Sequence, residues 1–173
     1  MTDDDMLAEF VRESNAIEGI YAVPGEPLYD DHLDEARHVF AAAEFMDIGP
    51  RNLHETLMAS EPSATPGMYR KVDVMVGGYR KMPWRDVPGA MEKLLDRAAV
   101  PSLSSSASDA GQWCWGLHHE FEHIHPFRDG NGRTGRLWMN ALRLAHGLSW
   151  LTVYARDRQA YYDSIRAWER ERA

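Results

Sequence analysis

Residues 125–136 of this 173-residue chain read HPFRDGNGRTGR, which places a histidine just ahead of a loop rich in glycine and arginine. Pro126 disfavours helical geometry at the residue before it, so a preceding helix should end near His125. Gly130 and Gly132 permit unusual backbone torsions and let main-chain amides approach a ligand closely. The stretch therefore predicts a bend between two helices, with a histidine beside a turn that binds anions.

The residues after this turn predict a second helix. Apolar side chains recur at helical spacing from Leu137 onward, so the helix should start near Asn131 or Gly132 and point its unpaired amides at the loop. Arg133 and Arg136 share one face of its first turns, where the helix dipole disfavours cations. A bound polyanion such as a phosphate chain would remove that conflict.

Three side chains of the loop have chemistry that suits this arrangement. An imidazole with an ordinary pKa is partly neutral near pH 7, so His125 can take a proton from a hydroxyl nucleophile. Asp129 offers hard oxygen atoms that suit a magnesium ion bridging phosphate oxygens. Phe127 lies between polar neighbours and should be buried as an anchor of the loop. The residues alone predict a base, a phosphate-binding turn and cations.

The same stretch resembles, without a departure, the core signature of the Fic family, histidine-x-Phe-x-acid-Gly-Asn-Gly-Arg-x-x-Arg. The resemblance implies a mainly α fold, a Fic-type helical bundle with one β-hairpin flap. It also implies an ATP-dependent protein adenylyltransferase, in which His125 deprotonates a hydroxyl on a target protein. That hydroxyl attacks the α-phosphate of ATP, pyrophosphate leaves, and AMP stays on the target.

The resemblance also assigns the phosphates of ATP within a catalytic phosphate-binding loop, residues 125–136. Asp129 would hold Mg²⁺, Asn131 and the loop amides the α-phosphate, Arg133 the β-phosphate and Arg136 the γ-phosphate. A phosphorylating branch of the family has lysine in place of Gly132 and alanine in place of Gly130, and this chain has neither change. The implied ATP-binding residues are Gly130, Asn131, Gly132, Arg133 and Arg136.

A second signature lies near the N-terminus, where residues 14–19 read SNAIEG. It resembles the inhibitory helix motif of the family, Ser/Thr-x-x-x-Glu-Gly/Asn. Ser14 and Glu18 are one helical turn apart and face the same way, and Gly19 should end the helix as a left-handed cap. The resemblance implies an inhibitory helix over residues 6–19.

In that family the glutamate pairs with the second arginine of the signature, so Glu18 should pair with Arg136 and take the place of the γ-phosphate. A bidentate carboxylate–guanidinium pair worth roughly 1 to 3 kcal/mol would suppress the competent state about 5- to 150-fold. The resemblance leaves open whether Glu18 also supports removal of AMP from the target. The alternative is a terminal amphipathic helix with a glycine stop and no inhibitory role.

Residues 69–84 depart from the helical pattern and predict a β-hairpin. Val72, Val74 and Val76 alternate with other residues, and two glycines at 77–78 provide the turn. The resemblance implies a flap that docks an unknown target protein by strand addition. The alternative is a structural hairpin that packs its valines onto the helices.

Elsewhere, apolar residues recur at helical spacing and glycines, prolines or serines fall between the runs. Tyr161 and Tyr162, in the last run, either line an adenine pocket or pack as core aromatics. Tyr69 and Arg70 resemble a family pattern near the flap, with no chemical step assigned to them. The helical runs cover roughly residues 30–46, 51–59, 87–99, 107–124, 132–145 and 157–170.

Two other functions compete with AMP transfer. Residues 119–123 read HEFEH, in which His119 and His123 lie one helical turn apart for zinc and Glu120 is a potential base, as in a zinc hydrolase. No third zinc ligand is obvious downstream. The other alternative is a non-catalytic nucleotide-binding module, which would not need a base such as His125 beside the phosphate turn.

The global composition favours one cytoplasmic domain over residues 1–173. A formal charge of −8 and a pI near 5.4 argue against partners such as nucleic acid or an anionic membrane. The start is acidic where a secretory signal would be basic, and no apolar run reaches membrane-spanning length. The sequence leaves open the identity of the target, modification of the chain by itself, and a homo-oligomer.

Overall fold

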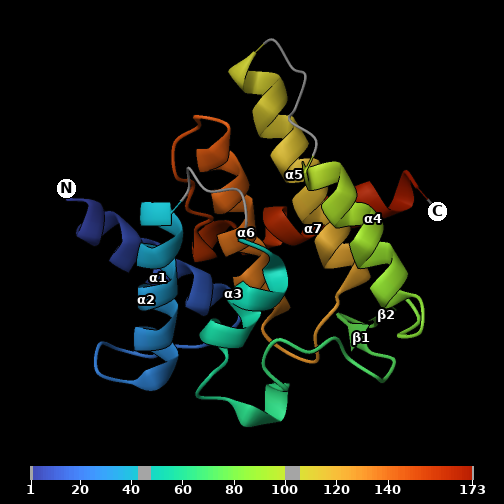
Figure 1. Cartoon of the computed structure of the whole chain (residues 1–173), viewed down its shortest axis with the longest axis horizontal. Coiled ribbons are helices and arrows are strands. Elements are labelled where there is room, and N and C mark those ends of the chain that lie inside the picture. Colours follow the sequence, from blue (N-terminus) through green and yellow to red (C-terminus); the bar gives the residue numbers. More distant parts are fainter. Residues whose placement is uncertain (1, 43–47, 100–105, 173) are drawn as a thin grey trace.

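The structure is a computed structural model, and it describes residues 2–42, 48–99 and 106–172 (Figure 1). This part of the chain contains seven α-helices and one short β-hairpin, which confirms the mainly α class. Two single 3₁₀ turns, Pro62–Ala64 and Ala155–Asp157, lie between these elements. The elements are α1 (Asp3–Ile17), α2 (Pro27–Ala42), α3 (Pro50–Leu57), β1 (Met75–Val76), β2 (Tyr79–Arg80), α4 (Val87–Ala99), α5 (Ala107–Ile124), α6 (Asn131–Ala145) and α7 (Arg158–Arg170).

Helix α6 lies at the centre of the bundle (Figure 1). It packs against α1, α2 and α3 on one side and against α5 on the other, and α5 in turn packs against α4 and α7. Apolar side chains from α1 to α6 meet in one buried cluster around it. Because burial of apolar area is the main stabilising term, the start of α6 is held in place by most of the fold.

Helix α1 is part of this core. Its start has a capping box in which Thr2 and Asp5 satisfy each other's backbone amides, and three acidic residues in the first turn suit the helix dipole. Leu7, Phe10 and Val11 are fully buried against the other helices. The N-terminal motif is therefore presented from a helix that the fold requires.

The bend between α5 and α6 forms where the sequence predicts it. Helix α5 ends at Ile124, and His125 takes a left-handed backbone conformation with φ of 52° ahead of Pro126. Gly130, with φ of 73°, precedes α6. Phe127 is buried between them and stacks on His54, with ring centroids 3.8 Å apart. The His54 ring also bridges two backbone groups of neighbouring loops.

The hairpin is shorter than residues 69–84 and does not pack as a valine-lined structural element. Met75 pairs with Arg80 and Val76 with Tyr79 across the glycine turn. Val72 is 51% exposed and Val76 39% exposed, whereas Val74 is partly buried. Two of the three valines are therefore not buried against the helices as the structural alternative predicts.

Two helix boundaries differ from expectation or fall partly outside the described residues. Helix α2 begins at Pro27, three residues before the expected start, because proline is well suited to the first helical position. The end of that expected run, residues 43–46, lies outside the described residues, as do residues 101–105 of the serine-rich connection. In the part that is described, no helix is both long enough and apolar enough to cross a membrane.

Candidate active site

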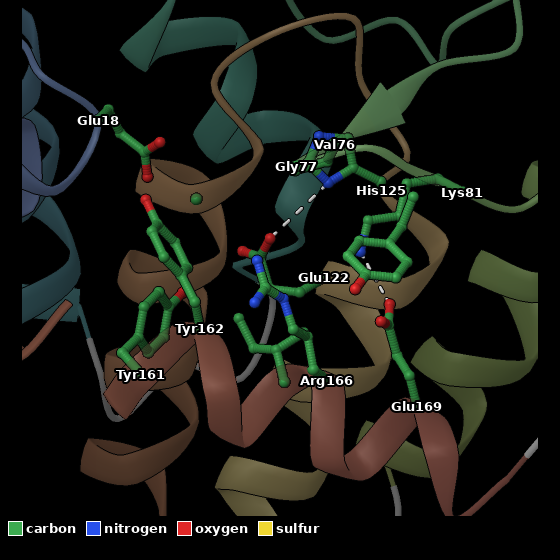
Figure 2. A pocket seen from close by; sticks show the side chains of 13 residues that line it. Glu18, Val76, Gly77, Lys81, Glu122, His125, Tyr161, Tyr162, Arg166 and Glu169 are labelled. Carbon is green, nitrogen blue, oxygen red and sulfur yellow. Dashed lines mark hydrogen bonds and ion pairs between the residues drawn. The ribbon is translucent and has the colours of Figure 1, made fainter. Parts of the chain in front are cut away.

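The bend, the hairpin, α7 and the end of α1 enclose a pocket of about 250 Å³ (Figure 2). His125 and Gly132, at the start of α6, line it, and Val76, Gly77 and Lys81 line it from the hairpin segment. Glu18 reaches in from the end of α1, and Tyr161 and Tyr162 come from α7. The structure therefore brings the two sequence signatures to one cavity.

His125 is the residue best placed to accept a proton there. Its side chain is only 16% exposed, and Nδ1 lies 3.8 Å from Oε2 of Glu122. Burial lowers the pKa of His125 to about 3, and the charge of Lys81 acts in the same direction. The expected pKa near neutrality is therefore wrong, because the ring is enclosed. The imidazole is neutral across the physiological range.

Arg133 provides a cation at the start of α6. Its guanidinium is buried, and its Nε and Nη1 atoms have no hydrogen-bond partner among the described residues. Burial lowers the pKa of Arg133 from its ordinary value, although a guanidinium remains charged at neutral pH. A buried charge without a partner is costly, so this group is suited to bind an anion.

Arg136 is fully buried and already has an internal anion. Its Nη2 donates to Glu18 Oε1 at 2.8 Å and to the backbone carbonyl of Ser14 at 2.9 Å, and its Nε donates to Ser14 Oγ at 2.9 Å. The Glu18 contact is monodentate, so it differs from the bidentate pair that was expected. Burial opposes the charge, but Tyr161 and Glu18 more than compensate and raise the pKa of Arg136.

The Glu18 carboxylate lies directly over the first turn of α6. A Cβ atom added to Gly132 would lie 2.1 Å from Glu18 Oε1 and 3.0 Å from Arg136 Nη1. Only glycine leaves room for a carboxylate in this place. The positive end of the helix dipole and the arginines then favour an anion, here supplied by the chain itself.

Asn131 has a different role from the one expected for it. Its Oδ1 accepts from the backbone amide of Phe127 at 2.8 Å, and its Nδ2 donates to the carbonyl of the same residue at 3.0 Å. The side chain thereby closes the loop on itself and is 3% exposed. Asn131 therefore shapes the turn, and the contact with the α-phosphate that the resemblance implies for it stays a prediction.

Asp129 and Gly130 complete the turn. Asp129 is exposed, and its Oδ1 accepts from the amide of Gly130 at 2.6 Å. A Cβ atom added to Gly130 would lie 2.6 Å from Sδ of Met58, and the φ of 73° also favours glycine. The Asp129 carboxylate keeps free oxygen capacity beside Arg133, so it could hold a magnesium ion whose other ligands are phosphate oxygens and water.

The three residues of the HEFEH motif each contact a different partner. His119 Nε2 lies 3.1 Å from Ser164 Oγ, His123 Nδ1 lies 3.3 Å from a carboxylate oxygen of Glu169, and Glu120 forms an ion pair with Arg97. Within residues 2–42, 48–99 and 106–172, no three His, Cys, Asp or Glu side chains gather in a way that could hold a metal ion. The geometry gives no support to the zinc alternative.

Arg70 is a structural residue of the site whose role the sequence does not reveal. Its Nε donates to the carbonyl of His125 at 2.8 Å and its Nη1 to that of Val72 at 2.7 Å, while its Nη2 donates to the carbonyls of Ile124 and Met82. The side chain is buried. Arg70 therefore fixes both ends of the hairpin segment to the backbone of the bend between α5 and α6.

A second set of contacts joins the hairpin segment to α7. Lys81 Nζ lies 2.8 Å from Glu169 Oε1, and the side chain of Lys81 is 7% exposed (Figure 2). The Arg166 guanidinium lies over the ring of Tyr79, 5.4 Å from its centroid. Because these residues are far apart in the sequence and lie outside both motifs, no local pattern could identify them.

Tyr161 and Tyr162 make packing contacts in the site, and a role for them in binding adenine stays a prediction. Tyr161 is buried, and its hydroxyl lies 2.9 Å from His118 Nε2 and 3.4 Å from Arg136 Nη1. The Tyr162 hydroxyl donates to the carbonyl of Ile17 at 3.1 Å. Both residues line the pocket as well as tying α7 to the rest of the site.

Comparisons with known proteins agree with this geometry. The model of the Fic/DOC family matches residues 50–142, over half of the chain. A protein adenylyltransferase Fic from Culex quinquefasciatus is 30% identical over 115 residues, which cover 65% of this chain and 22% of that protein. The chain thus spans about a fifth of the length of the curated relatives that it matches.

Solved structures match over nearly the whole chain. A Fic domain containing signaling protein from Bacteroides thetaiotaomicron superposes with a TM-score of 0.78 at 19% identity, covering 95% of this chain and 72% of that one. A Fic family protein from Desulfovibrio desulfuricans G20 gives a TM-score of 0.68 at 27% identity, covering 95% and 57%. The bend, the buried arginines and the family match lead to the same conclusion: the chain belongs to the Fic/DOC family.

Proposed function

We propose that this chain is a protein adenylyltransferase that transfers AMP from ATP to a hydroxyl side chain of a target protein and that Glu18 inhibits it internally. One observation carries the proposal: a carboxylate of the chain occupies an anion site formed by Arg136 and the start of α6, in the same pocket as the neutral His125. The names of the curated relatives support a nucleotide-transferring activity.

In this reaction His125 takes the proton of the target hydroxyl. Its Nδ1 faces Glu122, so Nε2 is the ring nitrogen left for the proton. The hydroxyl oxygen forms a bond to the α-phosphorus, the bond to the α–β bridging oxygen breaks, and pyrophosphate leaves with that electron pair. Arg133 and the amides at the start of α6 would hold the phosphates in line for the attack. Asp129 would hold Mg²⁺, which when bound neutralises charge on the leaving pyrophosphate.

The inhibition follows from competition for one cation. While Glu18 is bound to Arg136, a γ-phosphate cannot use the same Nη2 donor, so ATP binds without its productive contacts. We expect Glu18→Gly to raise the rate of AMP transfer about 5- to 150-fold, because a coupling of 1 to 3 kcal/mol is removed. Ser14→Ala should raise it less, since it removes only one of the contacts to Arg136.

The assay is incorporation of label from ATP labelled at the α-phosphate into the chain and into lysate proteins, read on gels and by mass spectrometry. Glu26→Gly, which changes an exposed glutamate outside the pocket, is the matched control and should leave labelling unchanged. His125→Ala in the Glu18→Gly background should abolish transfer and retain ATP binding. Equal labelling by the wild type and Glu18→Gly would contradict the inhibitory role of Glu18.

We further propose that the target segment docks on the hairpin by adding a strand. The side chains of β1 and β2 are exposed, and Arg70 fixes the hairpin segment to the backbone of His125. A strand bound there would lie beside the base.

Val74→Pro tests this docking surface. Proline disrupts an extended pairing edge, so the variant should lose target labelling at least fivefold while its affinity for ATP, measured by calorimetry, stays within about twofold. Parallel losses of labelling and ATP binding would mean that the hairpin only supports the fold.

A further inference from the structure

Glu122 lies in the last turn of α5, three residues before His125, and its carboxylate points into the pocket toward the ring (Figure 2). Oε2 lies 3.8 Å from His125 Nδ1. Within the described residues, neither Glu122 Oε1 nor His125 Nδ1 has a hydrogen-bond partner, and both atoms are buried. The oxygen that faces the ring is Oε2, and Oε1 of the same carboxylate is the one without a partner. A buried carboxylate and a neighbouring buried imidazole that each have an unpartnered polar atom are costly, so this arrangement calls for an explanation.

Packing does not explain a carboxylate at this place. Glu122 is 6% exposed, and a Cβ atom added to Gly135 would lie 2.7 Å from its Oε1, so α6 leaves space for the side chain where it crosses α5. Burial raises the pKa of Glu122 to about 7, although the nearby Arg136 opposes this effect. The charged or titratable groups that face Glu122 from the other elements are Arg136, Lys81, Glu18, Glu169 and Tyr161.

We propose that Glu122 is a positioning residue that accepts the Nδ1 proton of His125 in the reacting complex. This pairing leaves Nε2 free to receive the proton of the target hydroxyl, and it stabilises the imidazolium that forms. The inference rests on the proposed AMP transfer. A separation of 3.8 Å is longer than a hydrogen bond, and catalytic contacts are often long before the substrate binds.

This role has a consequence for the pH dependence of the reaction. The pKa of His125 is about 3, so the ring itself stays neutral above pH 5 and cannot cause a loss of activity just below neutrality. Glu122, with a pKa of about 7, is ionised above that pH and protonated below it. Only the ionised carboxylate offsets the charge of the imidazolium. The rate should therefore rise as the pH increases through about 7.

The experiment uses the full chain with Glu18→Gly as the parent and follows its self-labelling from ATP labelled at the α-phosphate. Glu122→Gln should lower the rate constant at saturating ATP about 10- to 100-fold. The ATP concentration that gives half of the maximal rate should change less than about twofold. It should also remove the rise in rate around pH 7. Glu122→Asp should recover part of the rate and keep that rise.

Glu120→Gln is the matched control, since it changes a carboxylate of the same helix that contacts Arg97 outside the pocket. It should leave the rate and its pH profile unchanged. The backbone carbonyl of Glu122 also lies near the ring of His125, and the Gln variant retains it. Any difference therefore reports the side-chain carboxylate alone.

A second measurement does not depend on turnover. The ¹⁵N resonances of the His125 ring should show a proton on Nδ1 and shift with a midpoint near pH 7 as Glu122 titrates, and Glu122→Gln should abolish that midpoint. Unchanged rates and resonances in Glu122→Gln would overturn the proposal, as would equal losses of rate and ATP affinity. If the parent labels no protein, the proposal of AMP transfer is wrong. In that case the ¹⁵N resonances alone test whether Glu122 pairs with His125.

Discussion

Gly135 is a residue at which α6 lies close against α5. A Cβ atom added there would lie 2.7 Å from Glu122 Oε1, 3.0 Å from Phe121 and 3.1 Å from His118. Two of these neighbours are ring atoms fixed in the core, so the helices themselves would have to separate. The glycine thus sets the distance between the helix that carries the base and the helix that begins the phosphate site.

We expect Gly135→Ala to lower the free energy of unfolding by about 1–3 kcal/mol through overpacking. Gly116→Ala is a matched control in α5, because no atom lies within 4 Å of its added Cβ. That variant should gain up to about 1 kcal/mol from helix propensity. Urea denaturation measures both changes, and a neutral or stabilising Gly135→Ala would show that the crossing has spare room.

At this scale the sequence predicts the identities of the site residues better than their environments. The pairing of Glu18 with Arg136 lies where the resemblance implies it. The ordinary pKa expected for His125 does not match the structure, because segments distant in sequence bury the ring. The hydrogen bonds by which Asn131 closes the loop on Phe127 are local, and they were not expected from the sequence. In the sequence, nothing distinguishes Glu122 from an exposed charged residue of a helix, because α6 and α7 bury it only in the folded chain.

At the scale of elements, the hairpin is positioned by one side chain more than by its own strands. Each strand has two residues and both are exposed, whereas Arg70 holds four backbone carbonyls around the bend. Lysine could reach only part of this set, because its ammonium group lacks the planar fork of the guanidinium.

We expect Arg70→Lys to lower the free energy of unfolding by about 1–3 kcal/mol and to lower AMP transfer by the Glu18→Gly parent at least tenfold. Arg80→Lys, at an exposed position in the same hairpin, should change stability by less than about 0.5 kcal/mol. Thermal unfolding and labelling assays compare the two. Full transfer by Arg70→Lys would mean that the bend keeps its shape without the hairpin.

Helix boundaries follow from the sequence where capping and breaking residues are strong. Helices α4 and α5 have the bounds that periodicity predicts, since Ser106 caps one end of α5 and Pro126 follows the other. The hairpin is much shorter than its alternating valines suggest, and Val72 and Val76 stay exposed. Alternation records a preference for extended backbone and does not reveal whether a packing surface exists.

At the scale of the whole molecule, buried histidines make the fold sensitive to acid. Burial lowers the pKa of each below its ordinary value, to about 4 for His54 and about 3 for His118. The unfolded chain therefore takes up these protons first as the pH falls below about 6.5. Glu122 acts in the opposite direction, because its raised pKa makes the folded chain bind a proton between about pH 7 and 4.5. The histidines with lowered pKa values are His32, His54, His118, His119 and His125.

We expect the free energy of unfolding to be highest above pH 6.5 and to fall between about pH 6.5 and 4. Each buried histidine contributes a slope of at most about 1.4 kcal/mol per pH unit, and Glu122 offsets one of them. Urea titrations at a series of pH values measure the net slope. A stability that does not change across this range would show that the histidines are more accessible to water than the packing implies.

The position of α1 in the core limits the ways in which the inhibition that we propose could be relieved. Proteolytic removal of the first turns of α1 would take Leu7, Phe10 and Val11 out of the core and unfold the bundle together with the inhibitory motif. A rotamer change of Glu18 alone, whose side chain is about one-third exposed, would free Arg136 and leave the core intact. Such a change breaks no covalent bond, so it is reversible.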